Sequence, residues 1–526
     1  MLTEIRHQTE VCVVGGGLAG LCAAVACARH CAKTLLMHER PVLGGNASSE
    51  IRVWICGAHG DNNRETGIIE ELLLENQYRN PDKNYALWDS VLYSLAREQS
   101  GLTLLLNCTC MDGAMAGDRL ASIRGYQLTT QRFHRVEAEV FIDCSGDSIL
   151  APITGAPCRV GREARAEHGE SIAPAQADRK TMGLSCLIQA RKTREENIFI
   201  PPAWAKKKTR DMLAPYRLPD MDDPQENFWY LELGGDRDSI GDTEALRDEL
   251  LAEAMGLWDY IKNDPANREK NRCWHLDWIG FLPGKRESRR YQGAYTLTQG
   301  DVEAGGRFDD LIAYGGWTMD DHHPGGLATP EPPNVFHPAP SPFGIPYRCL
   351  YSLAVTNLMF AGRNISATHA ALSATRVMAT CATLGQAAGT AAALAVRWGE
   401  GPDGVYRHHL RELQQALMDD DCYLPFRPRP VGDLNRATLP EIRRGLMRPM
   451  PCNRPEDWPA SCVPQTLARL VRVEARTDGG WQQLAALENH QQLVRIPLNV
   501  ETDALRVFFN ETWGAEEAHI FAAELW

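Results

Sequence analysis

The sequence predicts an α/β protein of two or three domains, because of its length and because two distant segments suit the same parallel sheet. A chain of 526 residues exceeds what one hydrophobic core supports. Residues 10–14 form a short apolar run that ends in glycines, a helix of small side chains follows at 18–30, and a second strand lies at 34–37. A buried strand returns at 357–361, before a long small-residue helix. The order of these strands and helices predicts a single domain that is interrupted in sequence by an insertion.

The remaining elements divide the chain further. We predict helices at 66–79 and 86–99 and strands at 103–106, 121–129 and 139–144. Residues 166–345 are charged and rich in Trp and Pro, whereas residues 470–473, 493–496 and 505–509 alternate apolar and polar side chains as strands do. The predicted units are a discontinuous nucleotide-binding domain (1–165 and 346–400), an inserted α+β substrate domain (166–345), a linker (401–450) and a small β-sandwich-like domain (451–526).

Composition excludes several classes of partner. The formal net charge is −13, which argues against nucleic acid or an anionic membrane as the main partner. The sixteen cysteines include no C-x-x-C pair, so we predict no metal site, and a reducing, cytoplasmic location. Residues 377–396 carry no charge and are long enough to span a bilayer, but their Ala, Gly and Thr content favours a buried helix. A homo-oligomer is compatible with the sequence.

A glycine motif lies at the first strand–helix junction. Gly15, Gly17 and Gly20 form G-x-G-x-x-G, with the strand before it and the helix after it that this motif requires. The glycines allow a tight turn, close approach of a pyrophosphate and helix–strand packing, and the helix N-terminus attracts phosphate. Glu39 ends the second strand, where a carboxylate binds ribose hydroxyls and repels a 2′-phosphate. We therefore predict a Rossmann-like domain that binds FAD or NAD rather than NADP.

Three further segments resemble flavoproteins of the glutathione-reductase fold. Gly44-Gly45-Asn46 resembles their pyrophosphate loop, residues 141–147 resemble their second glycine motif, and residues 360–364 with the helix at 376–389 resemble their last strand–helix junction. In that fold the late helix points its N-terminus at the flavin, and Ala379, Gly385 and Gly389 are expected to let helix and cofactor approach closely. The FAD contacts that the resemblance and the glycine motif together imply are Gly15, Gly17, Gly20, Glu39, Arg40, Gly45, Asn46, Gly146, Asp147, Gly362, Arg363, Asn364 and Arg376.

Taken together, these segments resemble a bacterial family called FAD-dependent oxidoreductases, beside the succinate dehydrogenase and fumarate reductase flavoproteins. The resemblance covers about residues 8–400 and is closest at 43–58, 283–290, 320–326 and 362–389. It implies an FAD enzyme, and members often lie among carbohydrate-degradation functions. Arg363-Asn364 stands where the family pattern has an acidic residue. Residues 40–58 contain no histidine to match the flavin-linking one of succinate dehydrogenases, so we expect non-covalent FAD.

Four residues are candidates for the chemistry. His322 and His323 follow two aspartates in a loop with Pro324, which suggests a histidine base oriented by a carboxylate. Arg286 belongs to a basic island that also holds Lys285, Arg289 and Arg290, and arginine suits a carboxylate or an oxyanion. His369, in the loop after Asn364, precedes the flavin-facing helix.

These residues support three hypotheses. The first is oxidation of a CH–OH group of a small sugar, polyol or hydroxy acid, with a histidine that takes the hydroxyl proton. The second is a CH–CH dehydrogenase or reductase whose arginines bind a carboxylate substrate. The third is a lyase or isomerase that holds flavin without net redox turnover. The carbohydrate context, and a loose resemblance of the C-terminal segment to a galactose-binding-like sandwich, favour sugars slightly.

Overall fold

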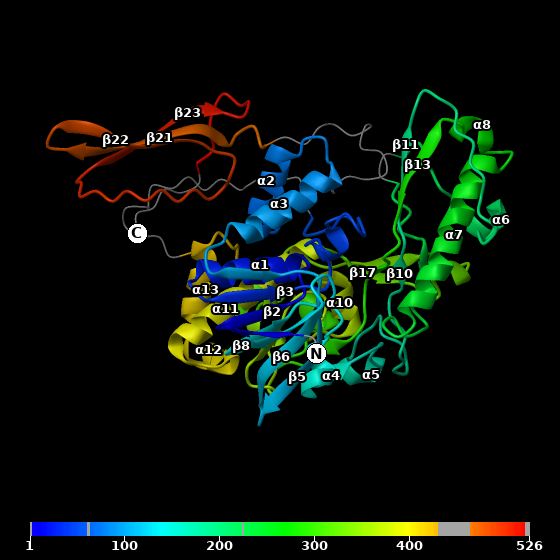
Figure 1. Ribbon diagram of the computed structural model, residues 1–526, viewed down its shortest axis with the longest axis horizontal. Coiled ribbons are helices and arrows are strands. Elements are labelled where there is room, and N and C mark those ends of the chain that lie inside the picture. The colour runs from blue at the N-terminus through cyan, green and yellow to red at the C-terminus, as the bar shows by residue number, and fades with distance from the viewer. Residues whose placement is uncertain (1–2, 60–63, 224–225, 430–462, 521–526) are drawn as a thin grey trace.

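A five-stranded parallel sheet lies at the centre of the molecule (Figure 1). The computed structural model describes residues 3–59, 64–223, 226–429 and 463–520. The strand order is β20-β8-β2-β3-β4, and every neighbouring pair is parallel. The strands are β2 (Val11–Val14), β3 (Thr34–Met37), β4 (Leu102–Leu105), β8 (Val140–Asp143) and β20 (Leu358–Phe360). The predicted α/β class is confirmed. So is the prediction that strands from two distant parts of the chain share one parallel sheet, since β20 pairs with β8.

Two helices from opposite ends of this domain pack directly on each other. They are α1 (Leu18–Arg29) and α11 (Met378–Trp398), both almost wholly buried. A Cβ atom on Gly385 would lie 2.0 Å from the Ala19 carbonyl oxygen, and one on Gly389 2.2 Å from that of Ala23. The expectation that these two glycines make room for the cofactor is therefore wrong: they let two helix backbones touch.

The predicted helix at 376–389 corresponds to α11, and a second helix that the sequence did not predict precedes it. A short helix, α10 (His369–Thr375), comes first, with the Thr368 hydroxyl accepting from Ala371 N as its N-cap, and Arg376 lies between α10 and α11. His369 is thus the first residue of a helix and not a loop residue. The helices that complete this side of the domain are α2 (Ile68–Arg79), α3 (Tyr85–Arg97), α12 (Pro402–His408) and α13 (Leu410–Asp419).

Among the described residues, α11 is the one helix long and apolar enough to cross a membrane. Within its most apolar window, 94% of the residues are buried inside the protein. Its uncharged surface is therefore covered by the rest of the chain, as the sequence predicts.

A second sheet packs beside the first. It has the order β1-β7-β6-β5, with β1 (Glu4–Gln8) parallel to β7 and the other pairs antiparallel. The other strands are β5 (Cys108–Ala116), β6 (Arg119–Gln127) and β7 (Arg132–Glu137). The sequence does not predict β1, because its charged residues alternate with half-buried ones at an exposed edge.

The inserted region has two kinds of packing. Helix α7 (Thr243–Asn263) and the strands β11 (Ile188–Lys192) and β13 (Trp274–Ile279) share a hydrophobic cluster of their own and form a projecting arm (Figure 1). In contrast, β16 (Leu311–Gly315) and β19 (Phe343–Pro346) belong to the main core. Packing therefore joins part of the predicted substrate domain to the nucleotide-binding side.

The remaining elements are short, and α6 and α8 among them lie on the arm (Figure 1). The predicted loop at 320–323 contains a strand, β17 (Met319–His322), paired antiparallel with β18 (Asn334–His337), so His322 ends a strand. The others are α4 (Leu150–Thr154), β9 (Cys158–Arg159), α5 (Arg165–His168), β10 (Leu184–Ser185), α6 (Arg210–Leu213), β12 (Glu232–Leu233), α8 (Arg268–Asn271), β14 (Gly284–Lys285), β15 (Arg290–Tyr291) and α9 (Gln299–Glu303).

The C-terminal part holds a three-stranded sheet of β21 (Ala468–Thr477), β22 (Gly480–Glu488) and β23 (Leu505–Thr512). Within residues 463–520 this is a single sheet and not a sandwich of two, and residues 493–496 form no strand, contrary to expectation. The sheet contacts α2 where the His490 ring stacks on Tyr78 at 4.1 Å. The described residues of the predicted linker are not a free connection either, because Val405, Leu413 and Leu417 lie in the main core.

Candidate functional site

The three glycines of the N-terminal motif differ in what surrounds them. Gly15 has φ of +101°, and a Cβ there would lie 2.5 Å from the Cys144 carbonyl oxygen. A Cβ on Gly20 would lie 1.7 Å from the Gly15 oxygen. On Gly17 the nearest atom to a Cβ would be Gly45 Cα at 3.8 Å. Two of the glycines are thus required by the protein's own packing, whereas Gly17 borders open space.

The loop opposite closes this space into a cradle. Gly44 N donates to Gly16 O at 2.8 Å, and Gly45, with φ of +60°, faces Gly17. At the start of α1 no side chain caps the helix, and the first intrahelical bond runs from Leu21 N to Gly17 O at 2.9 Å. The helix therefore presents its N-terminal amides and its positive dipole to the cradle. We call this site the glycine cradle; it comprises Gly15, Gly17, Gly20, Gly44 and Gly45.

An ionised carboxylate lies at the end of the second strand, beyond the cradle. Burial would raise the pKa of Glu39, but the hydrogen bond with His38 and the charges of His38 and Arg40 outweigh it and lower the pKa to about 2. Arg40 bonds Glu50 at 3.4 Å and reaches toward Gly45. Sequence reasoning missed His38, although its Nδ1 lies 2.9 Å from Gly16 N and 3.1 Å from the Glu39 carboxylate and so connects the glycine turn to Glu39. Its position next to Glu39 is the only signal that the sequence offered.

Asp147 is the centre of an ion cluster. Its carboxylate accepts from Lys285 Nζ and Arg363 Nη2, each at 2.8 Å, and from Ser288 Oγ at 2.7 Å. Burial raises the pKa of Asp147, but the charges of Arg363 and Lys285 lower it to about 2. The Arg363 guanidinium lies against Gly146, which has φ of +75° and leaves no room for a Cβ. Asp147 thus connects Arg363, another predicted FAD residue, to Lys285 of the basic island.

Two other predicted contacts lie close by. Asn46 Nδ2 donates to Lys285 O at 2.9 Å, which ties the cradle loop to the same island. Asn364 donates to Asp143 O at 3.3 Å, while its Oδ1 is buried and has no hydrogen-bond partner among the described residues. Gly362, with φ of +104°, approaches the Ala19 side chain. The segments that the sequence placed around one dinucleotide therefore meet in space, and the unsatisfied Asn364 oxygen is available to a donor.

His322 lies between two carboxylates in the buried interior. Its Nδ1 is 2.7 Å from Glu232 and its Nε2 is 3.3 Å from Asp320. Glu232 also accepts from Gly183 N at 2.7 Å, while Asp320 accepts from Arg376 at 3.1 Å. Burial raises the pKa of Glu232, but nearby Arg286 and His322 lower it below its usual value.

His369 has a parallel arrangement. Its Nδ1 is 2.9 Å from Glu287 and its Nε2 is 3.0 Å from Asp321. Burial alone lowers the pKa of His369, but the charges of Glu287 and Asp321 outweigh it and raise the pKa to about 10. His369 is therefore an imidazolium at neutral pH. The two sets together form the histidine network, made of Glu232, Asp320, His322, Glu287, Asp321 and His369.

The other two catalytic candidates have structural partners. His323 is outside the network: its Nδ1 accepts from Gly325 N at 3.0 Å and so stabilises the turn after β17. Arg286 donates to Ser185 Oγ at 2.8 Å and to Trp229 O at 3.1 Å, and it pairs with Glu232 at 3.3 Å. Its guanidinium is therefore occupied by the protein. The basic island is not a solvated turn, because Arg290 is buried, Arg286 is partly buried, and both are paired with glutamates.

Sequence reasoning missed both glutamates of the network. Glu232 lies 90 residues from His322, and Glu287 lies 82 residues from His369. No local spacing connects them. Glu287 stands inside the basic run of residues 285–290, and an acid among four bases was the one signal available.

Comparison with known proteins gives only distant structural similarities for the three solved structures named here. No curated protein matches the chain. The structure is similar to a geranylgeranyl bacteriochlorophyll reductase-like protein from Thermoplasma acidophilum (12% identity, 80% of this chain, 85% of that one, TM-score 0.34) and to the flavin-dependent brominase Bmp2 (10%, 77%, 84%, 0.35). The match to L-proline dehydrogenase from P. horikoshii has 15% identity and a TM-score of 0.18, and spans 28% of this chain and only 24% of that one. At these scores none of the three carries an argument.

The family comparison is decisive. The model of a family described as "FAD dependent oxidoreductase" matches residues 10–417, which is more than three quarters of the chain. The match spans the glycine cradle and the histidine network alike. FAD, the cofactor of this family, also suits the site. The cradle leaves space beside Gly17, where the pyrophosphate of FAD would meet the amides of α1. The chain belongs to the FAD dependent oxidoreductase family, and it is an enzyme whose cofactor is FAD.

Proposed function

We propose that this enzyme oxidises a CH–OH group of a small hydroxylated molecule, such as a sugar, a polyol or a hydroxy acid. FAD, when bound, supplies the acceptor for the hydride. His322 accepts the proton of the substrate hydroxyl. The observation that carries the proposal is the position of His322 between Glu232 and Asp320, because two carboxylates stabilise the charge that the ring gains.

The two contacts of His322 have different lengths, which assigns them different roles. The short bond from Nδ1 to Glu232 fixes the ring, since Glu232 is itself held by Gly183 N and by Arg286. The contact from Nε2 to Asp320 is longer, at 3.3 Å, and Asp320 has other donors in Arg376 and Asn334. Nε2 is thus the nitrogen that a substrate hydroxyl takes over.

We assign the cofactor contacts as follows. The α1 amides at Gly17 and the opposing Gly45 would hold the pyrophosphate, and Glu39 would accept from the ribose hydroxyls. The amide oxygen of Asn364 would accept a hydrogen bond from FAD, since it lacks a donor among the described residues. Asp147 acts indirectly in this assignment, by holding Arg363. The FAD is non-covalent.

The geometry favours this reaction over the CH–CH alternative. A carboxylate substrate needs arginine donors that are free to form a fork. Arg286 is bound to Ser185, Trp229 and Glu232, and Arg376 is bound to Asp320. His369 is protonated and so serves as a fixed positive charge rather than as the base. Since the cations at the network are already paired with its carboxylates, the site suits an uncharged sugar or polyol better than a carboxylate, a hydroxy acid included.

The location proposed for the enzyme is the cytoplasm. All fourteen cysteines that the structure describes are free thiols, and a reducing compartment maintains such thiols. Burial raises the pKa of Cys56, the thiol next to the cradle loop, to about 11. It is therefore not a thiolate at neutral pH and takes no redox part here.

Anaerobic reduction of the yellow protein tests the proposal. Wild type is mixed with a panel of sugars, polyols and hydroxy acids, and bleaching of the flavin absorbance is followed. We expect an alcohol to bleach it, and expect His322→Gln to slow bleaching by at least about a hundredfold with FAD still bound. His323→Gln is the matched control and keeps the rate. Equal rates for His322→Gln and wild type would remove His322 as the base, and reoxidation of reduced enzyme by unsaturated dicarboxylates alone would favour the CH–CH reaction.

A further inference from the structure

The outer side of the projecting arm carries exposed apolar side chains. Ile198 and Ile200 are 82% and 83% exposed, Trp204 53%, Met212 61% and Tyr216 51%. We call these five residues the outer patch. They lie within nineteen residues of chain and all belong to the segment between β11 and β12. Isolated exposed apolar residues need no explanation, but five of them in one short segment mark a candidate binding surface.

The segment is firmly attached to the arm. Asn263 at the end of α7 donates to Phe199 O at 3.1 Å, and Lys206 N donates to Ala252 O at 2.9 Å. Phe199 turns inward and packs on the cluster of α7, so Ile198 and Ile200 on either side of it point outward. The exposure of the two isoleucines is thus built into an anchored extended segment.

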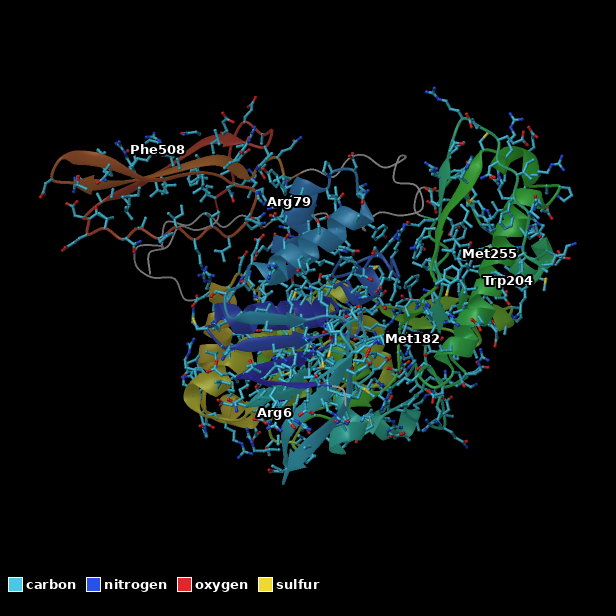
Figure 2. All side chains as sticks on the ribbon, viewed as in Figure 1. Arg6, Arg79, Met182, Trp204, Met255 and Phe508 are labelled. Carbon is cyan, nitrogen blue, oxygen red and sulfur yellow. The ribbon has the colours of Figure 1, made fainter. Side chains whose placement is uncertain are left out.

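The outer patch faces away from the rest of the molecule. Figure 1 shows α6 on the far side of α7 from β11 and β13, and Figure 2 shows Trp204 at the outer edge of the arm. The glycine cradle and the histidine network lie toward the other side of the arm, in the body of the protein. A partner bound to the outer patch would therefore leave the entrance of substrate and cofactor uncovered.

The patch is basic although the protein is acidic. Residues 191–212 hold seven Lys and Arg against three Asp and Glu, a formal net charge of +4 in a chain of −13. Arg191 pairs with Asp277, and Lys206 and Lys208 both pair with Glu253, so these two carboxylates reduce the local net charge to +2. Arg194, Lys207 and Arg210 are exposed, and no acidic side chain in the described part of the chain pairs with them. Three cations are thus free to attract anions beside the apolar side chains.

We propose that the outer patch docks the enzyme on the surface of an anionic lipid bilayer. Tryptophan and tyrosine favour the membrane interface, isoleucines on a protruding segment enter the outermost acyl region, and lysine and arginine bind anionic headgroups. Charge complementarity selects this occupant over a second copy, since a symmetric dimer through this patch would bring two positively charged surfaces together. The overall charge of −13 predicts no such surface; the local charge overrides it because screening limits electrostatic range to about 10 Å.

Vesicle co-sedimentation of the FAD-loaded enzyme tests the proposal. Vesicles of phosphatidylcholine with 30 mol% phosphatidylserine, as our chosen composition, are compared with phosphatidylcholine alone at low and at physiological salt. We expect binding to the anionic vesicles at least about tenfold tighter, and weaker at the higher salt. No binding to the anionic vesicles at low salt would overturn the proposal.

Variants separate the apolar and the ionic contributions. The double variant Ile198→Ser/Ile200→Ser and the double variant Lys207→Glu/Arg210→Glu should each reduce binding at least about tenfold, since one basic side chain near an anionic surface contributes about fivefold. All four side chains are exposed, so flavin absorbance and the thermal midpoint should not change. Leu128→Ser, 71% exposed on the β6–β7 turn, is the matched apolar control and should bind as wild type.

Two other results would assign the patch differently and so overturn the proposal. Undiminished vesicle binding by both double variants would place the lipid contact elsewhere. Absence of vesicle binding, together with a mass that doubles with concentration and returns to monomer in Ile198→Ser/Ile200→Ser, would make the occupant a second copy. Light scattering after size exclusion measures that mass.

Discussion

The glycine cradle and the histidine network bind charge by opposite means. The cradle uses backbone: helix amides at Gly17, a facing loop at Gly45, and few side chains. The network uses side chains from β12, β14–β15, β17 and α10, each cation of which already touches a carboxylate. The cradle is open to an anion that comes from outside, whereas every cation at the network is already paired with a carboxylate of the protein. The difference teaches that the cradle suits the charged cofactor, while the paired cations of the network are the reason for proposing an uncharged substrate.

The variant with the largest expected effect blocks the glycine cradle. Gly17→Val should give a folded but colourless protein, because the Cβ itself fits, with Gly45 Cα 3.8 Å away, while the side chain fills the pyrophosphate space. Flavin absorbance measures binding and circular dichroism measures the fold. Gly300→Val is the control, since its Cβ has the same 3.8 Å to the nearest atom and lies in α9. A yellow Gly17→Val protein would contradict the pyrophosphate assignment.

A variant with a moderate expected effect tests the charge pairing of His369 in the histidine network. His369→Gln should lower the free energy of unfolding by about 3 kcal/mol at neutral pH, because Glu287 and Asp321 lose the cation between them. Urea denaturation measures it. His323→Gln, which removes only a turn contact, serves as the control and should cost about 1 kcal/mol.

The same histidine gives a pH dependence of known sign. The folded-state pKa of His369 is raised to about 10, above an unfolded value near 6.5. Its contribution to stability is therefore complete below about pH 6.5 and is lost as the pH rises through about 10. The difference in unfolding free energy between wild type and His369→Gln should shrink over that range. A constant difference would mean that the network does not hold an imidazolium.

The variant with the smallest expected effect tests whether Glu39, at the end of the second strand, contributes to FAD affinity. Glu39→Gln should weaken FAD binding by about tenfold, because an ionised acceptor for the ribose is replaced by a neutral one. Glu50→Gln is the control: Glu50 also contacts Arg40 but does not end the second strand, and it should change affinity by less than about twofold. Titration of the apoprotein with FAD measures both. Equal affinities for the two variants would remove Glu39 from the ribose.

The sequence predicted the cradle better than the network for a physical reason. The first part of the cradle is contiguous: strand, glycines and helix follow within residues 11–29, so their spacing predicts them, while Gly44 and Gly45 were predicted from the family resemblance. The short buried strands β3 and β8 were equally visible as apolar runs. The network depends on tertiary contacts over 82 to 90 residues, which no periodicity records. The sequence therefore supplied His322 and His369 but not the glutamates that define their roles.

Local context also misled where polar residues form regular structure. Residues 319–322 are a strand because they pair with β18, although their two aspartates favour a turn. Glu4–Gln8 is a strand because the Arg132–Glu137 strand offers it an edge. The family resemblance led to the expectation that Gly385 and Gly389 make room for the cofactor. The atoms next to them are instead those of α1.

The backbone contact between α1 and α11 has a consequence for how the enzyme is made. The α1 helix leaves the ribosome early, but its buried face meets α11 only after residues up to 398 exist. Strand β20, which borders β8, is also made late. The nucleotide-binding domain therefore cannot mature during synthesis of its first 165 residues, and these must wait with apolar surface uncovered. Chaperone demand and flavin loading should both peak late in translation.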